Sequence, residues 1–334
     1  MDKTKNEDYR SAFFTLLLAA ASVFISVFFL PAVFFLPALL AYAIARNGYL
    51  LGGLVIALCL MGIYLLSPVL CLIISALFLP PALAAGYMIR SHARFFNKVL
   101  IASGASLLGI ALSTGATWLL ADISPADYIT GAIVGSLAKL SEQNIKWFYS
   151  IFRSADVLSG AITQTAVDAT PPSEAIGIIR NMLSISVNTL LVSFMVIFAL
   201  MTGLLSVVVP ISRAKKYGVS IYVMPRFSEY RLPKRFWLAF VLSYAAARLG
   251  EGFGFDGFDI LGITVFNVYS FIFIVQGLSL LDYFYKTRNI RVSSRVILHF
   301  LTAFMAGLVL VIIGLIENMS NLRKRFGQQG GAAT

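Results

Sequence analysis

The sequence predicts an all-α protein, a polytopic transmembrane helical bundle of eight or nine spans. Nine apolar stretches lie between Ser11 and Met319, 59% of the 334 residues are hydrophobic, and only 12% are charged. A helix of about 20 apolar residues crosses a hydrocarbon layer about 30 Å thick, and it closes its backbone hydrogen bonds within itself, as a layer without water requires. The mean hydropathy of +0.87 agrees with a membrane protein.

The expected spans follow the apolar stretches in order. The first run is too long for one span, and Pro31 and Pro37 interrupt it. Since proline breaks a helix interior, we expect a helix near 11–30 and a short helix near 32–46. The remaining spans are expected at 48–66, 68–89, 98–120, 182–211, 236–250, 260–283 and 296–317. The 236–250 stretch is short and contains an arginine, which predicts a tilted or partial crossing.

Basic residues predict the orientation, because Lys and Arg accumulate on the cytoplasmic side of membrane proteins. They cluster at the N-terminus, at Arg46, and in the connections 90–98, 213–235 and 286–295. Counting spans from 213–235 places all of these in the cytoplasm and places 121–181 outside. The same count puts the basic residues 323–325 outside, against the rule. Either this tail is an exception, or one of the stretches 236–250 and 32–46 does not cross.

The chain divides by composition into four parts. We expect an N-terminal transmembrane bundle at 1–120, an extracytoplasmic amphipathic helical insertion at 121–181, a C-terminal transmembrane bundle at 182–317 and a disordered tail at 318–334. In the insertion, Ser124, Pro125 and Asp127 predict the N-cap, first position and first turn of a helix. Its amphipathic part lies on the outer membrane interface in one interpretation and forms a lid over an outward-facing cavity in the other. If the next helix runs unbroken over 172–211, it is about 60 Å long, so part of it protrudes, tilts or bends.

Catalytic and metal-binding patterns are absent from the sequence. There are two histidines, His92 and His299, and no HExxH, GxSxG or GxxxxGK[ST] motif. Cys59 and Cys71 lie in apolar stretches without a CxxC pattern. We therefore predict no catalytic residue, no metal and no cofactor. The net charge of +11 is spread over short connections beside apolar stretches, which favours the lipid bilayer and its anionic headgroups as a partner and argues against nucleic acid.

Polar residues inside the expected spans are the candidate substrate-binding residues, because a polar group in a membrane normally faces the bundle or a cavity. They are Asn188, Asn267, Tyr269, Gln276 and Ser279. Tyr269 and Gln276 are seven residues apart and share one helix face with Ser279. In one interpretation this face lines a cavity for a small molecule. In the other, the polar groups hydrogen-bond neighbouring helices.

The order of these features resembles the YybS-like family of bacterial membrane proteins (domain of unknown function 2232). The matching features are Pro80-Pro81 with Gly86 and Arg90, Leu232-Pro233 before Phe236-Trp237, Asn267, Gln276-Gly277, and the basic end of the stretch from Leu315 to Arg325. That family is similar to the S components of energy-coupling-factor transporters, six-helix proteins that capture small solutes and rely on separate ATPase subunits. The resemblance implies a bacterial cytoplasmic membrane, and the six spans of 11–211 fit the S-component pattern. The 121–181 insertion and the three additional helices are not part of a minimal S component.

Two functions remain open. The first is a small-solute binding or transport subunit that lacks its own ATPase and works with other membrane or ATPase subunits. The alternative is a membrane scaffold or regulatory protein that recruits partners through its basic cytoplasmic loops. An intramembrane enzyme would additionally require the carboxylates of Glu251, Asp256 and Asp282 to converge.

Overall fold

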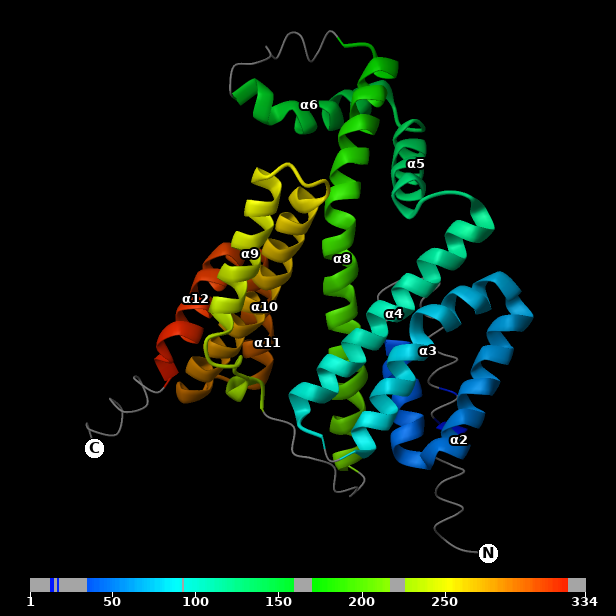
Figure 1. Ribbon diagram of the computed structural model, residues 1–334, viewed down its shortest axis with the longest axis vertical. Coiled ribbons are helices and arrows are strands. Elements are labelled where there is room, and N and C mark those ends of the chain that lie inside the picture. Colours follow the sequence, from blue (N-terminus) through cyan, green and yellow to red (C-terminus); the bar gives the residue numbers. More distant parts are fainter. Residues whose placement is uncertain are drawn as a thin grey trace, which may run out of the picture. The chain divides into compact units, whose positions relative to one another are not determined.

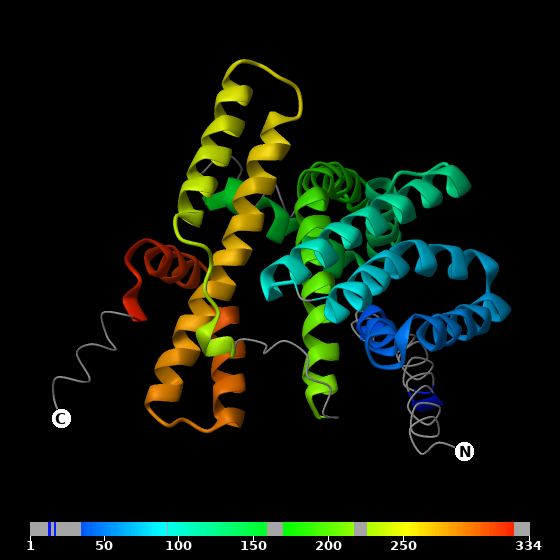
Figure 2. The same cartoon turned by 60° about the horizontal axis from the view of Figure 1, so that its bottom comes forward.

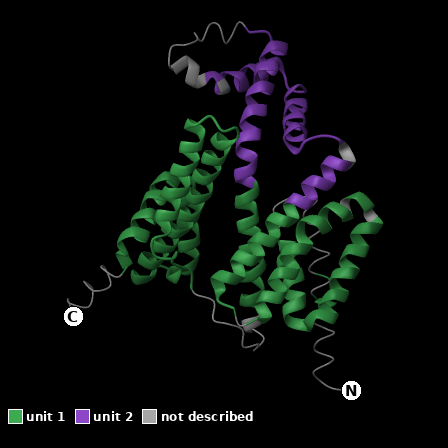
Figure 3. Ribbon diagram, viewed as in Figure 1, with its two compact units in different colours: residues 1–110, 195–334 green, residues 111–194 purple. Residues whose placement is uncertain are grey.

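The computed structural model describes residues 13, 14, 17, 35–91, 93–158, 170–216 and 226–323, and over these ranges it contains helices and no strand (Figure 1). The elements are α2 (Leu36–Leu66), α3 (Pro68–Arg90), α4 (Phe95–Ala121), α5 (Pro125–Leu137), α6 (Glu142–Leu158), α8 (Pro172–Lys216), the 3-10 turn η2 (Phe227–Glu229), α9 (Phe236–Gly252), α10 (Phe258–Thr287), α11 (Val292–Met305) and α12 (Gly307–Ser320). The chain forms two compact units, 1–110 with 195–334, and 111–194 (Figure 3).

Five of the described helices are long and apolar enough to cross a membrane, namely α2, α3, α4, α8 and α10. The α11–α12 pair makes a sixth if it is counted as one span. The predicted all-helical membrane bundle is therefore confirmed. The expected span at 11–30 lies largely outside the described residues. The helix α9, which covers the expected 236–250 stretch, has 17 residues and a length of about 25 Å, which is short for a full crossing.

The helix α2 consists of two helices joined at Gly48, as the separate stretches 32–46 and 48–66 predict. Gly48 has φ 84° and ψ 177°, outside the helical region. The chain then folds back so closely that a Cβ on Gly52 would lie 2.7 Å from the Cα of Ile44. Residues 36–47 alone form a helix only about 18 Å long. The expected crossing at 32–46 is thus one arm of a helical hairpin, and the other arm follows Gly48.

Basic side chains close the helix ends beside this break. The Arg90 Nη1 donates to the carbonyl of Ile44 at 3.5 Å. The buried Lys98 Nζ donates to the carbonyls of Ile89 at 3.2 Å and Ser91 at 2.8 Å, at the end of α3. Lysine and arginine satisfy the last carbonyls of a helix and complement its dipole. Residues used above to predict orientation therefore also hold helix ends together.

The helices α3 and α4 approach each other at a double proline. Pro80 and Pro81 lie inside α3 and have no N–H, so the carbonyls of Ala76 and Leu77 lose their partners in the helix. The helix α4 passes these carbonyls at Gly109, where a Cβ would lie 2.5 Å from the Leu77 oxygen and 2.9 Å from the Ala76 oxygen. Small side chains from α2, α3, α4 and the end of α8 complete the core there: Ala41, Ala45, Ala85, Ile89, Ala102, Val207 and Ile211.

The unit 111–194 contains the predicted start of α5. The Asp127 N–H donates to the Ser124 Oγ at 3.1 Å, and Pro125 occupies the first helical position, as expected. The core of this unit is formed by Leu137, Ile145, Tyr149, Ala175 and Ile179. The helix α8 runs unbroken for 45 residues, about 67 Å, so the condition stated for 172–211 is met and the helix exceeds the thickness of a hydrocarbon layer. The extracytoplasmic side of this region, and its role as interface helix or lid, stay predictions.

The helices α9 to α12 pack around α10, which lies antiparallel beside α9 in Figures 1 and 2. Aromatic rings join α9 to α10: Phe236 and Phe240 each lie 5.2 Å from Tyr269 between ring centroids, and Phe240 lies 5.9 Å from Phe273. The helix α12 meets α10 at glycines, since a Cβ on Gly277 would lie 2.5 Å from the Leu310 carbonyl oxygen. This bundle positions the polar site described next.

Candidate functional site

Polar side chains gather around the C-terminal third of α10, where η2, the start of α11 and the end of α12 meet. The group comprises Arg226, Ser228 and Tyr230 of the connection before α9, Gln276, Ser279, Asp282 and Lys286 of α10, Arg295 and His299 of α11, and Glu317 and Arg323 at the end of α12. They form two neighbouring arrangements, a buried network and a charged pocket.

The buried network fixes the connection 226–235 against α10. The Ser279 Oγ lies 2.6 Å from the Phe227 carbonyl oxygen and 3.0 Å from that of Tyr230. The Gln276 Oε1 accepts from the Leu232 N–H at 3.0 Å. Backbone groups of the connection thus use the polar atoms of two predicted substrate-binding residues. This geometry agrees with the interpretation of Gln276 and Ser279 as hydrogen-bond partners between elements, while solute binding by them stays a prediction.

Arg323 is the centre of the same network, with only 2% of its surface exposed. Its Nη1 donates to the carbonyls of Ser228 at 2.7 Å and Tyr230 at 3.1 Å, and its Nη2 donates to the Ser279 Oγ at 3.0 Å. Its Nε lies 3.4 Å from the Glu317 carboxylate. Burial lowers the pKa of the Arg323 guanidinium, and Glu317 opposes that shift. Residues 318–323, expected to be disordered, take part in this network, whereas 324–334 lie outside the described residues.

The stretch 296–317 differs from the expected straight span, because α11 and α12 are bent by 105° at the break between them. Both ends of the pair return to the same part of α10. Near its start, Arg295 contacts Asp282 at 3.1 Å, and after its end Arg323 contacts Ser279 at 3.0 Å. The pair therefore does not carry the chain to the other end of α10. Arg323 lies directly against the basic connection 226–235, which places the basic tail beside basic residues that the count assigns to the cytoplasm; which stretch fails to cross stays a prediction.

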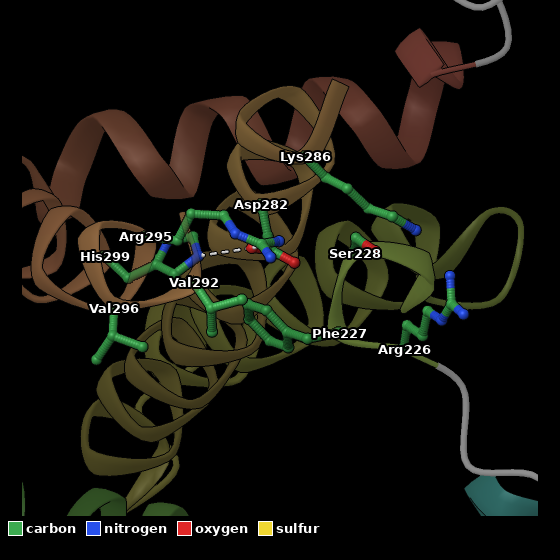
Figure 4. A pocket seen from close by; sticks show the side chains of 9 residues that line it. All are labelled: Arg226, Phe227, Ser228, Asp282, Lys286, Val292, Arg295, Val296 and His299. Carbon is green, nitrogen blue, oxygen red and sulfur yellow. Dashed lines mark hydrogen bonds and ion pairs between the residues drawn. The ribbon is translucent and has the colours of Figure 1, made fainter. Parts of the chain in front are cut away.

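The charged pocket has a volume of about 460 Å³ and lies between the connection at 226–228, the end of α10 and the first two turns of α11 (Figure 4). Arg226, Lys286, Arg295 and His299 line it together with a single carboxylate, Asp282. Among the described residues neither Arg226 nor Lys286 forms an ion pair, and Figure 4 shows both side chains on the Ser228 side of the pocket. With histidine neutral, three cations and one carboxylate leave a net charge of +2.

Asp282 joins the two charged side chains of α11. Its Oδ1 lies 3.1 Å from the Arg295 Nη1 and 3.3 Å from the His299 Nε2, and the carboxylate is 13% exposed. The Phe227 ring packs edge-on against the imidazole with 5.8 Å between centroids. The Nε of Arg295 and the Nδ1 of His299 are buried and have no hydrogen-bond partner among the described residues. Such atoms in folded proteins are usually completed by a ligand or an ordered water.

The remaining predicted site residues lie apart from this pocket. Tyr269 belongs to the aromatic contact between α9 and α10, and Asn267 is half-buried further along α10. Asn188 is exposed on α8 in the other compact unit. The helix α10 therefore brings Gln276 and Ser279 to the site, whereas Tyr269 takes part in packing. His92 lies outside the described residues.

Sequence reasoning missed the charged pocket, although one signal was present. Arg295 and His299 are four residues apart on α11 and so share a helix face, and a short turn connects that helix to Asp282 on α10. An antiparallel pair of this kind brings the acid opposite the two bases. The basic residues at 286–295 predict orientation, and two of them, Lys286 and Arg295, also line the pocket.

The described part of the chain contains no group of three or more His, Cys, Asp or Glu side chains that could hold a metal. The carboxylates required for an intramembrane enzyme do not converge. Glu251 and Asp256 lie before α10, and the helix rise places Asp282 about 36 Å from the start of α10 at Phe258.

A comparison with protein families shows where the chain belongs. The family model described as a predicted membrane protein (DUF2232) matches residues 13–316. No curated protein and no solved structure matches the chain. The match agrees with the predicted YybS-like family, and similarity to S components stays a prediction. Since the match covers most of the 334 residues, from the first apolar run into α12, the chain belongs to the DUF2232 family of predicted membrane proteins.

Proposed function

We propose that the protein is a membrane subunit that binds a small anionic solute in the charged pocket and has no energy source of its own. The observation that carries the proposal is the pocket of about 460 Å³ in which Arg226, Lys286 and Arg295 face one carboxylate. Cavities of about 300–1,000 Å³ are typical of small-molecule sites. ATP-driven transport would require separate ATPase subunits, because the sequence lacks a GxxxxGK[ST] motif.

The basic rim supports a cytoplasmic entrance to the pocket. Arg226 of the connection 226–235 and Lys286 and Arg295 at the ends of the connection 286–295 line it, and such basic residues accumulate on the cytoplasmic side. The proposal therefore places the protein in the bacterial cytoplasmic membrane with the N-terminus and this pocket in the cytoplasm. A solute would reach the pocket from inside the cell, or leave the protein there after transport.

The test is a melting experiment on the purified protein in detergent with a panel of small carboxylate, sulfate and phosphate anions. A ligand present at 100 times its Kd stabilises the folded state by about 2.7 kcal/mol, so at least one anion should raise Tm. Lys286→Gln removes a pocket cation and should weaken that anion about fivefold to tenfold, since a hydrogen bond to a charged group contributes about 1.5–3 kcal/mol and solvent screens this exposed lysine in part.

The matched control is Arg288→Gln, which removes one exposed cation two residues away and outside the pocket. It should leave the affinity within about twofold, because exposed pairs and single surface charges contribute little. Absence of stabilisation by every anion would contradict the proposal. Equal weakening by both substitutions would also contradict it, because the effect would then report overall charge and not this pocket.

A scaffold function remains a second candidate, and one observation favours it. Arg231, Lys234 and Arg235 surround a separate hollow of about 290 Å³, and the network described above fixes the connection that carries them. Crosslinking from Lys234 in membranes separates the two functions. Recovery of transporter ATPase subunits favours the binding subunit, and recovery of unrelated envelope or division proteins favours the scaffold.

A further inference from the structure

We infer that the anion bound in the charged pocket is a phosphate monoester, carried by a phospholipid headgroup of the phosphatidic acid type or by a free phosphorylated solute. This inference rests on the proposed function and specifies its ligand class. The charge of the pocket, its hydrogen-bond donors and its apolar wall each favour a phosphate.

Charge favours phosphate over carboxylate. Arg226, Lys286 and Arg295 supply three positive charges, and Asp282 removes one, which leaves +2 with histidine neutral. A phosphate monoester carries a charge of about −1.5 to −2 near neutral pH, whereas a carboxylate carries −1. A phosphate monoester therefore neutralises the pocket with one group, while a single carboxylate leaves about one positive charge uncompensated. The dicarboxylate succinate carries about the same charge as the phosphate, so it separates the effect of the phosphate group from that of charge alone.

Arg295 is the side chain best prepared for an oxyanion. Asp282 contacts the Nη1 of Arg295, and the Nε of Arg295 has no hydrogen-bond partner among the described residues. A guanidinium offers five N–H donors in a rigid plane, and it binds phosphate through two parallel hydrogen bonds. Asp282 also contacts the His299 Nε2 at 3.3 Å and so fixes the imidazole beside Arg295. Asp282 is thus a positioning residue that orients Arg295 and leaves donor capacity on its guanidinium.

The outer wall of the pocket suits a phosphate at the edge of the membrane. Val292 and Val296 of α11 line it, and their side chains remain 66% and 63% exposed. Further along α11, Phe300 is 73% exposed and Phe304 is 84% exposed. A phospholipid combines a charged headgroup with chains that would lie along this apolar face, and basic pockets between helices on the cytoplasmic side are known to bind such headgroups. A free phosphorylated solute would use the cations alone.

The experiment compares matched probes on the intact protein. In detergent, glycerol 3-phosphate and inorganic phosphate are compared with glycerate and succinate. In nanodiscs, bilayers of phosphatidylcholine with 10% phosphatidic acid are compared with pure phosphatidylcholine. We expect Tm to rise with a phosphate-bearing probe and to stay unchanged with the carboxylates. A response to phosphatidic acid alone identifies a lipid as the source, and a response to the soluble phosphates alone identifies a free solute.

Two substitutions tie the response to the pocket. Arg295→Lys keeps the charge but loses the planar pair of donors, and it should weaken the phosphate response at least tenfold. If Arg295→Lys lowers Tm even without ligand, Lys286→Gln provides the second test of the pocket. Arg288→Gln, which lies outside the pocket, is the control and should leave the phosphate response unchanged.

The outcomes separate the two proposals. Carboxylates that stabilise as well as phosphates would overturn the phosphate assignment and leave the proposed function in place. No stabilisation by any soluble anion or by phosphatidic acid would overturn both. A phosphate response that neither Arg295→Lys nor Lys286→Gln reduces would overturn the assignment to this pocket.

Discussion

Replacing Arg323 tests the buried network most severely. In the structure its guanidinium donates three hydrogen bonds to Ser228, Tyr230 and Ser279, and it is the charged partner of Glu317. Arg323→Met removes the donors and leaves a carboxylate that is 1% exposed without its partner. Removing one member of a buried ion pair typically costs about 3–5 kcal/mol, most of it the penalty of the remaining charge.

The substitution should therefore lower the free energy of unfolding by about 3–5 kcal/mol. Reversible unfolding in mixtures of SDS and a mild detergent measures this quantity. Adding Glu317→Gln to Arg323→Met should recover part of the loss, since the remaining side chain is then neutral. Arg291→Met is the control, because Arg291 is exposed and surface substitutions usually change stability by less than about 0.5 kcal/mol. A cost for Arg323→Met that equals the cost of the control, or no recovery in the double variant, would refute this reasoning.

Three further predictions concern packing, backbone conformation and pH. Gly277→Ala should cost about 1–3 kcal/mol in the same assay because its Cβ would meet the Leu310 carbonyl, whereas Gly104→Ala, with open space around it, should be neutral or stabilising. Gly48→Ala should cost about 1–2 kcal/mol because φ there is +84°, and Gly53→Ala, which has no such strain, should not; equal effects at the two positions would contradict the break in α2. Burial raises the pKa of Tyr230 above its usual value of 10.0. The neutral phenol therefore stabilises the fold fully below pH 10.0, and this contribution is lost as the pH rises through the higher pKa of the folded state. Tyr230→Phe should make unfolding less steep with pH above about 10, and an unchanged alkaline profile would contradict the burial of this side chain.

The sequence predicted those parts of the fold that depend on neighbouring residues. The cap at Ser124, the separation of the helices on either side of Gly48, and the unbroken helix α8 all follow from local rules and agree with the structure. The helical membrane class follows from apolar stretches alone. These features need no knowledge of which helices meet.

Other features depend on contacts between distant residues and were therefore not predictable. Arg323 contacts Ser279 and Ser228, which are 44 and 95 residues away, so its position next to the basic tail gave no hint of burial. The bend between α11 and α12 lies in a continuously apolar stretch, where hydropathy alone predicts one span. The charged pocket combines side chains of three elements, each of which is unremarkable alone.

The return of α11 and α12 to the end of α10 at which they began is what brings Arg323 to the buried network. Single cysteines at Lys234, Arg288 and Ser320 in a variant lacking Cys59 and Cys71 test it directly, with Asp256→Cys before α10 as the reference for the opposite side. Labelling with a maleimide that cannot cross membranes, in oriented vesicles, should modify 234, 288 and 320 from one side and 256 from the other. Modification of 320 from the side of 256 would show that α11 and α12 cross the membrane, and it would contradict the network around Arg323.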